Sequence, residues 1–300
     1  MRKLLVPALL LSAVLLFAIW QQFAIVAEIG EVAALEAEKP VDSNPAIEGF
    51  TFVEKNAQGY PEYTHDSSGI RFVRLPGGSF SMGSPASETI HDANAAPVHT
   101  VSLSPFLITK YEVTQAEYEA VMTGHEWLEP TPSFRTGPNL PVEQVSWLNL
   151  YEKDGFLRRT GLSLPSEAQW EYACRAGTPG PYAGTGNLDD MGWYTGNSGS
   201  RSGGHGQTHD VGSKKPNQFG LHDLHGNLWE WCVDRYDPAF YSKPAATQPN
   251  PVATGSDSDR VVRGGSFDFP AVYCRSSYRS SGRKGDRSKF IGVRLARPSP

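Results

Sequence analysis

Glycine and proline recur along the whole of this 300-residue chain, and they limit how much regular structure it can form. The sequence holds 30 glycines and 23 prolines, spread without a repeating period. Both residues interrupt helices and strands and favour turns. The chain is therefore expected to have many loops, short strands and few long helices.

The rest of the composition is that of a folded protein. Hydrophobic residues make up 39% of the chain and charged residues 20%. This apolar content is enough to offset the entropy cost of folding, so a chain disordered throughout is excluded. The net charge of −5 leaves no basic excess to neutralise phosphates, which argues against a nucleic-acid-binding protein.

The N-terminus predicts export. Met1, Arg2 and Lys3 precede an apolar run from Leu4 to Trp20 that contains no charged residue. A short positive start before such a run is typical of a secretory signal, and the run is close to the minimum length of a membrane-spanning helix. Residues 1–27 are therefore predicted to be a signal peptide or a membrane anchor. The rest of the chain is expected outside the cytoplasm, either periplasmic or anchored, with membrane contact only through this segment.

The chain after this segment divides by composition. Residues 28–68 are rich in alanine and glutamate and then mixed polar, which predicts a linker. Residues 69–298 are expected to form one domain. Alternation from Ile70 to Leu75 predicts a strand, with residues 79–84 returning as its hairpin partner after Pro76-Gly77-Gly78. Residues 99–103 are a further strand candidate.

Three helix starts are marked by capping residues. Thr114 precedes Glu117 by three positions and Ser166 precedes Gln169 by three, the pattern of a capping box. Ser146 is a third candidate N-cap. The chain after Cys174 is expected to be mostly loop until about Phe219, and residues 260–294 return to strand-like patches. Short strands and helices mixed in irregular chain predict an α+β fold.

Seven blocks of sequence, in order, resemble the formylglycine-generating enzyme, or sulfatase-modifying-factor, domain family across about residues 70–297. The blocks are residues 72–83, 111–118, 141–147, 164–178, 220–231, 263–267 and 291–294. The resemblance implies a C-type-lectin-related α+β single domain with much irregular loop.

The resemblance also implies a chemistry. Family enzymes oxidise a substrate cysteine to formylglycine on exported sulfatases, using oxygen and a copper ion held by two cysteines after a Gly-Gly-Ser segment. Counted from Ser266, these positions are Phe269 and Cys274. Soft thiolates select Cu(I), and phenylalanine cannot ligate a metal, so the copper pair is incomplete and the activity is expected to be altered.

Three residues are carried over as the catalytic candidates. Cys274 is the remaining thiol, and Ser266 and Tyr273 match polar residues of the family pocket. The expected partner is an exported protein or cysteine-bearing peptide such as a sulfatase. The sequence leaves open whether the domain is an enzyme, a non-catalytic lectin-like binding module with residues 178–216 as its surface, or a catalyst of another periplasmic oxidation or maturation.

A second count, back from Gly292, aligns Cys274 with a structural cysteine of the family. Its family partner falls on Cys174, so the resemblance implies a Cys174–Cys274 disulfide. Only one bridge is possible among three cysteines, and Cys232 would be left over.

The resemblance further implies structural calcium. The matching positions are Asp223, Asn227 and the carbonyl of His225, with Asn197 and the carbonyl of Ser198 as part of a second site. Oxygen ligands from a tight loop suit Ca²⁺, although the same residues also make ordinary polar turns.

Other polar residues are expected to be structural. The histidine pairs 205/209 and 222/225 are interpreted as loop or core histidines, and Glu230 is expected to accept hydrogen bonds in the core. The six arginines of the C-terminal segment are expected to form a solvated face.

Overall fold

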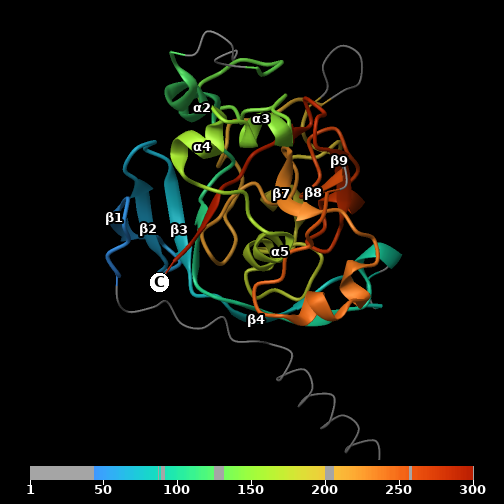
Figure 1. The fold of residues 1–300 in the computed structure, drawn as a ribbon. Coiled ribbons are helices and arrows are strands. Elements are labelled where there is room, and N and C mark those ends of the chain that lie inside the picture. The colour runs from blue at the N-terminus through green and yellow to red at the C-terminus, as the bar shows by residue number, and fades with distance from the viewer. Residues whose placement is uncertain are drawn as a thin grey trace, which may run out of the picture. The chain divides into compact units, whose positions relative to one another are not determined.

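Three β-sheets, arranged around a central helix, carry the fold in the computed structural model (Figure 1). It describes residues 44–86, 88, 92–124, 132–199, 206–256 and 259–299, all within one compact unit of residues 37–300. The predicted signal or anchor at residues 1–27 lies outside this part. Within it, no helix has both the length and the apolar content needed to cross a membrane.

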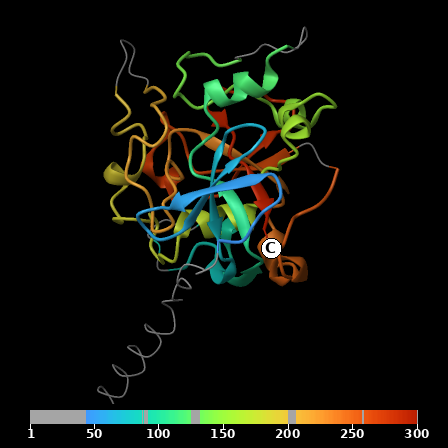
Figure 2. The same ribbon diagram turned by 90° about the vertical axis from the view of Figure 1, so that its left-hand side faces the viewer.

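The largest sheet has five antiparallel strands in the order β1-β2-β3-β6-β11. The strands are β1 (Phe50–Lys55), β2 (Pro61–His65), β3 (Arg71–Leu75), β6 (Phe106–Thr109) and β11 (Ala296–Pro298). β11 pairs with β6, so the end of the described chain closes one edge of the sheet. β1 forms the other edge and lies across the front of Figure 2.

The predicted linker at residues 28–68 is wrong for its second half, because β1 and β2 belong to this sheet. Phe50 and Tyr63 are buried, and the ring of Phe50 meets that of Phe72 edge-on at 5.2 Å. Charged residues in both strands, such as Glu54 and Glu62, obscure the apolar alternation that would have marked them.

The predicted strands at residues 70–75 and 99–103 are confirmed as β3 and β5 (His99–Leu103), but the predicted hairpin is wrong. β4 (Gly78–Met82) pairs with β5 in a separate two-stranded sheet and not with β3. Gly77 has a φ of 74°, and a side chain there would collide with the carbonyl oxygen of Leu103. The glycines therefore redirect the chain from one sheet into another instead of reversing it.

The third sheet has the order β10-β7-β8-β9. Its strands are β7 (Trp229–Arg235), β8 (Asp259–Arg263), β9 (Ser280–Arg283) and β10 (Ile291–Gly292). β10 runs parallel to β7, and the other pairs are antiparallel. The predicted return to strands after residue 260 is thus confirmed, and the segment between β8 and β9 holds the proposed catalytic residues.

The three predicted helix starts are confirmed. α2 (Gln115–Met122) and α5 (Glu167–Arg175) begin with complete capping boxes at Thr114 and Ser166, and α3 (Trp147–Tyr151) begins after Ser146. α4 (Phe156–Thr160) follows α3, and one short helix, α6 (Leu188–Met191), interrupts the predicted loop at residues 178–216. Four 3-10 turns lie at residues 93–95, 240–242, 244–247 and 271–274.

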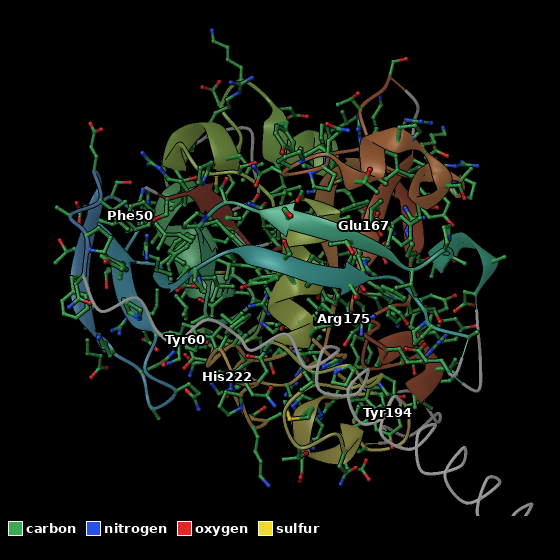
Figure 3. The ribbon with its side chains drawn as sticks, turned by 90° about the horizontal axis from the view of Figure 1, so that it is seen from below. Phe50, Tyr60, Glu167, Arg175, Tyr194 and His222 are labelled. Atoms are coloured by element: carbon green, nitrogen blue, oxygen red, sulfur yellow. The ribbon has the colours of Figure 1, made fainter. Side chains whose placement is uncertain are left out.

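α5 lies in the centre of the molecule, and nearly all of its residues are buried. Figure 3 shows Glu167 and Arg175 at its two ends, behind the two strands β4 and β5. Glu167 binds Arg279 through two hydrogen bonds (2.7 and 2.8 Å), and Glu171 binds both Arg175 (2.8 Å) and Arg263.

The predicted solvated face of arginines is therefore wrong for part of the C-terminal segment. Arg275, Arg279 and Arg294 are buried, and each pairs with a carboxylate. Buried guanidinium groups need such partners because an unpaired buried charge is costly. The linear sequence does not show where these partners lie. They are Glu88 and Asp92 for Arg275, Glu167 on α5 for Arg279, and Glu230 on β7, 64 positions earlier, for Arg294.

Candidate functional site

The segment from Ser266 to Cys274 follows β8 and is shaped by two glycines. Gly264 and Gly265 have φ values of 101° and 75°, which other residues rarely adopt. A side chain on residue 265 would lie 2.6 Å from the sulfur of Cys274. Ser266 is fully buried, and its hydroxyl has no hydrogen-bond partner among the described residues. An unsatisfied buried hydroxyl costs free energy and often marks a functional position.

Phe269, at the position expected for the first copper cysteine, lies among aromatic rings. Its ring meets those of Trp229, Tyr273 and Phe290 edge-on, at centroid distances of 5.6, 5.7 and 5.5 Å. Tyr278 packs against Tyr273 at 4.9 Å. These five residues are called the aromatic cluster below. It is an apolar environment, which gives no soft ligand to a metal ion.

Cys274 adjoins this cluster but is fully buried. Burial, together with the neighbouring thiol of Cys174, raises its pKa far above the ordinary value. Since the thiolate is the form that binds metals and attacks substrates, this environment keeps Cys274 protonated. The structure thus brings Cys274, Ser266 and Tyr273 onto one segment, but without an available thiolate.

The predicted Cys174–Cys274 disulfide is absent from the structure, in which all three cysteines are free thiols. The sulfur of Cys174 lies 3.5 Å from the hydroxyl of Ser276 and 3.7 Å from a ring nitrogen of His225. The other ring nitrogen of His225 donates to the carbonyl of Cys274 at 2.7 Å. Both cysteines therefore contact one buried imidazole, whose pKa burial lowers to about 4.

The predicted first calcium site gains a residue that the sequence analysis missed, Glu112. Its carboxylate accepts hydrogen bonds from the side chain of Asn227 (2.6 Å) and the backbone N–H of Leu228 (2.9 Å). Burial and the nearby Asp223 raise its pKa. One carboxylate oxygen of Asp223 is buried without a partner among the described residues, and burial raises its pKa to about 6.

These donors fit a hard divalent cation. Two buried, mutually repelling carboxylates are costly, and a cation held by oxygen ligands offsets that cost. Glu112, Asp223 and the amide oxygen of Asn227 are the residues that would hold it. The carbonyl oxygen of His225, the third predicted ligand, packs so closely against the backbone of Gly192 that a side chain at residue 192 would overlap it. Glu112 lies in the matching block of residues 111–118, next to the buried Val113. An acidic residue beside a core position of that block is the sequence feature that could have identified Glu112 as part of the site.

The predicted second calcium site does not fit. The side-chain oxygen of Asn197 accepts the backbone N–H of Tyr194 (3.0 Å), and the carbonyl of Ser198 accepts the Nε2–H of His209 (2.9 Å). Each of these oxygens already accepts one protein donor, as the amide oxygen of Asn227 does from the backbone N–H of His209 (3.0 Å). What distinguishes the first site is the buried carboxylate oxygen of Asp223 that has no partner among the described residues. In the part of the chain that the structure describes, no three His, Cys, Asp or Glu side chains are grouped to hold a metal.

The histidine pairs are not assembled as ligands. His205 lies outside the described residues, and His209 stacks on Trp193 with ring centroids 3.7 Å apart. The ring of His222 donates to the carbonyl of Lys214 at 2.8 Å. Glu230 accepts from Trp170 (2.6 Å) and from Arg294 (2.8 Å), as expected of a core carboxylate.

Known proteins are similar to this chain in sequence and fold. Residues 58–299 match the model of the sulfatase-modifying factor enzyme 1-like domain. The formylglycine-generating enzyme of Streptomyces coelicolor is 33% identical over 281 residues, covering 75% of this chain and 88% of that protein. The mouse protein named inactive C-alpha-formylglycine-generating enzyme 2 is 26% identical, covering 56% of this chain and 70% of its own length.

Solved structures of similar fold support the same family assignment. The structure of PvdO from Pseudomonas aeruginosa superposes with a TM-score of 0.66 at 28% identity, covering 85% of this chain and all of that one. The predicted fold, α+β and lectin-like with much loop, is thereby confirmed. On the match of residues 58–299, this chain belongs to the family of sulfatase-modifying factor enzyme 1-like, or formylglycine-generating enzyme, domains.

Proposed function

We propose that this protein is an exported member of the family that binds a polypeptide at the aromatic cluster and does not itself carry out copper-dependent cysteine oxidation. The observation that carries the proposal is the ring of Phe269, which packs on Trp229 at 5.6 Å where the family chemistry needs a thiolate. A phenyl ring supplies no ligand for copper.

The state of Cys274 supports the same conclusion. Its sulfur is fully buried and its pKa is raised, so the one cysteine that could bind copper is held as a thiol. The neighbouring thiol of Cys174 does not complete a copper pair, because Cys174 is fully buried as well and burial raises its pKa to about 12. The family also includes a protein whose name calls it inactive, the mouse relative at 26% identity.

Binding is expected to use the ring surfaces of the aromatic cluster, which do not depend on a metal ion. Tyr273, Tyr278 and Phe290 are only partly buried and offer flat apolar surfaces of the kind on which peptide side chains pack, while Trp229 is buried and supports the rings from below. The partner class that fits the family is an exported protein, such as a sulfatase, presenting an extended segment.

Calcium is proposed as a structural ion at Glu112, Asp223 and Asn227. It would neutralise two buried carboxylates and thereby stabilise the loop that leads into β7. The N-terminal apolar run supports the proposed export, and an exported domain would meet both extracellular calcium and secreted sulfatases.

The test is an aldehyde assay with the full chain. The purified protein is mixed with Cu(I), oxygen and a cysteine-bearing sulfatase peptide, with the Streptomyces coelicolor enzyme as the positive control. We expect the peptide to bind but to gain no hydrazide-reactive aldehyde. Aldehyde formation at a rate near that of the control would overturn the proposal and assign Cys274 as a working ligand.

A further inference from the structure

An exposed phenylalanine stands beside the aromatic cluster. Phe134 is 67% exposed, well above the next large apolar side chain in the described part of the chain, Val98 at 42%. Single exposed apolar residues are common on protein surfaces and need no explanation by themselves. Phe134 differs because its backbone is tightly held and because one lysine, Lys289, lies near both its ring and that of Phe290.

The backbone around Phe134 is held by Glu143. One carboxylate oxygen of Glu143 accepts the N–H groups of Phe134 (2.5 Å) and Arg135 (3.3 Å). The N–H of Glu143 in turn donates to the hydroxyl of Ser133 at 3.1 Å. The side chain of Gln115 donates to the carbonyl of Arg135 at 2.7 Å. Phe134 is therefore presented to solvent on a fixed loop, so little entropy would be lost when a partner covers it.

Lys289 connects Phe134 to the aromatic cluster. Its ammonium group lies 5.7 Å from the ring centroid of Phe134 and 4.9 Å from that of Phe290. Phe290 meets Phe269 edge-on at 5.5 Å. Phe134, Lys289 and Phe290 thus form a strip, named here the aromatic strip, that leads from the surface to the position of the family chemistry.

The strip carries positive charge. No carboxylate among the described residues forms an ion pair with Lys289. Glu143, whose pKa the charge of Lys289 lowers, is engaged with the backbone of residues 134 and 135. Arg287 is exposed, and its guanidinium donates to the carbonyl of Gln144 (3.0 Å). No carboxylate among the described residues forms an ion pair with it either. Lys289 and Arg287 thus give this surface a local positive charge, although the chain as a whole has a net charge of −5.

We propose that the aromatic strip docks an extended segment of a partner polypeptide in which an aromatic or large apolar side chain is flanked by Asp or Glu. The apolar side chain packs between Phe134 and Phe290, and the acidic group pairs with Lys289. This inference rests on the proposed function, because the strip leads to the peptide site named there. It adds the chemical class of the peptide that the site selects.

The experiment measures binding of three labelled peptides to the full chain by fluorescence anisotropy. All carry one cysteine: the first has Phe flanked by Asp and Glu, the second has Phe flanked by Lys, and the third has Gly flanked by Asp and Glu. The first is expected to bind at least about tenfold more tightly than either other peptide. Phe134→Ala should remove most of the preference for Phe, and Lys289→Glu should reverse the preference for charge.

Matched controls lie on the far edge of the five-stranded sheet. Phe52→Ala and Lys55→Glu change an exposed phenylalanine and a lysine of β1 and should leave binding unchanged. Equal binding of all three peptides, or equal losses in the control variants, would overturn the proposal. So would displacement of the first peptide by heparin or an oligonucleotide at the same charge concentration, which would mark a general polyanion surface.

The two proposals fail separately. If the acidic aromatic peptide binds selectively and is converted to an aldehyde, the proposed function fails and the docking surface stands. If no peptide is converted and none is preferred, the docking surface fails and the proposed function stands.

Discussion

At residue 269 the phenyl ring fills the space next to Trp229, Tyr273 and Phe290, while the second position of the copper pair, Cys274, is buried. Positions 269 and 274 therefore do not form a copper site that lacks only one thiolate, because the cysteine that is present is buried as well. The surroundings of Phe269 are aromatic rings, so replacing this residue changes packing more than it changes chemistry.

Phe269→Cys tests this view. The substitution removes ring contacts and is expected to destabilise the fold by about 1–3 kcal/mol in denaturant unfolding. Because Cys274 stays buried and protonated, tight Cu(I) binding and aldehyde formation should not appear. Copper is measured by competition with a chromophoric Cu(I) chelator, using Phe267→Leu as a packing control. Stoichiometric copper uptake by Phe269→Cys would show that only one ligand was lacking.

The three cysteines give a second prediction at this scale. All are buried free thiols, and burial raises the pKa of Cys174 to about 12. An alkylating reagent should label none of them in the native protein and all three after unfolding without reductant, as read by intact mass. Labelling of a single thiol after unfolding would instead support the disulfide that the family resemblance implies.

Glu143 predicts a pH dependence of stability. Burial raises its pKa from 4.5 to about 7, so the folded state binds this proton more tightly than the unfolded state. Stability is therefore lost as the pH rises from about 4.5 to about 7. Glu143→Gln keeps the oxygen that accepts the two N–H groups and removes the charge. Between pH 5 and 8 the wild type should lose about 1–3 kcal/mol more than the variant in urea unfolding. If the unfolding free energies of the wild type and of Glu143→Gln changed equally with pH, the raised pKa of Glu143 would be contradicted.

At the scale of elements, the capping boxes of α2 and α5 were predictable because each depends on residues three positions apart. The pairing of β4 was not predictable in the same way. A Pro-Gly-Gly turn is compatible with a hairpin and with a redirection of the chain, and only the contact of Gly77 with the backbone of Leu103 and Ser104 distinguishes them.

α5 also depends on partners from distant elements. Arg263 on β8 is fully buried and pairs with Glu171 on α5. Removing one partner of a buried ion pair leaves an uncompensated charge, so Arg263→Met should destabilise the protein by about 3–5 kcal/mol. The matched control is Arg283→Met on β9, which is exposed and should change the unfolding free energy by less than about 1 kcal/mol. Similar losses in both variants would contradict the assigned role of the pair.

At the scale of the whole molecule, Glu112 follows β6 and Asp223 and Asn227 precede β7, so an ion held between them would tie two sheets together. Calcium should raise the melting temperature of the wild type, and EDTA should reverse the shift. Glu112→Gln should lose the response, whereas Asn197→Ala, at the site that does not fit, should keep it. An unchanged melting temperature in the wild type would exclude a calcium site in the folded protein.

The sequence alone determined the family, the α+β class, the helix starts and the segment that holds Ser266, Tyr273 and Cys274. All of these depend on short local patterns or on ordered blocks of residues. Only the tertiary structure decided that β1 and β2 join the sheet, that Glu112 meets Asn227, and that the C-terminal arginines are buried. It also decided that Cys174 and Cys274 are free thiols and that the imidazole of His225 contacts the sulfur of Cys174 and the carbonyl of Cys274. The physical reason is that burial, ion pairing and side-chain contact join residues about a hundred positions apart, and no local spacing records which distant groups the folded chain brings together.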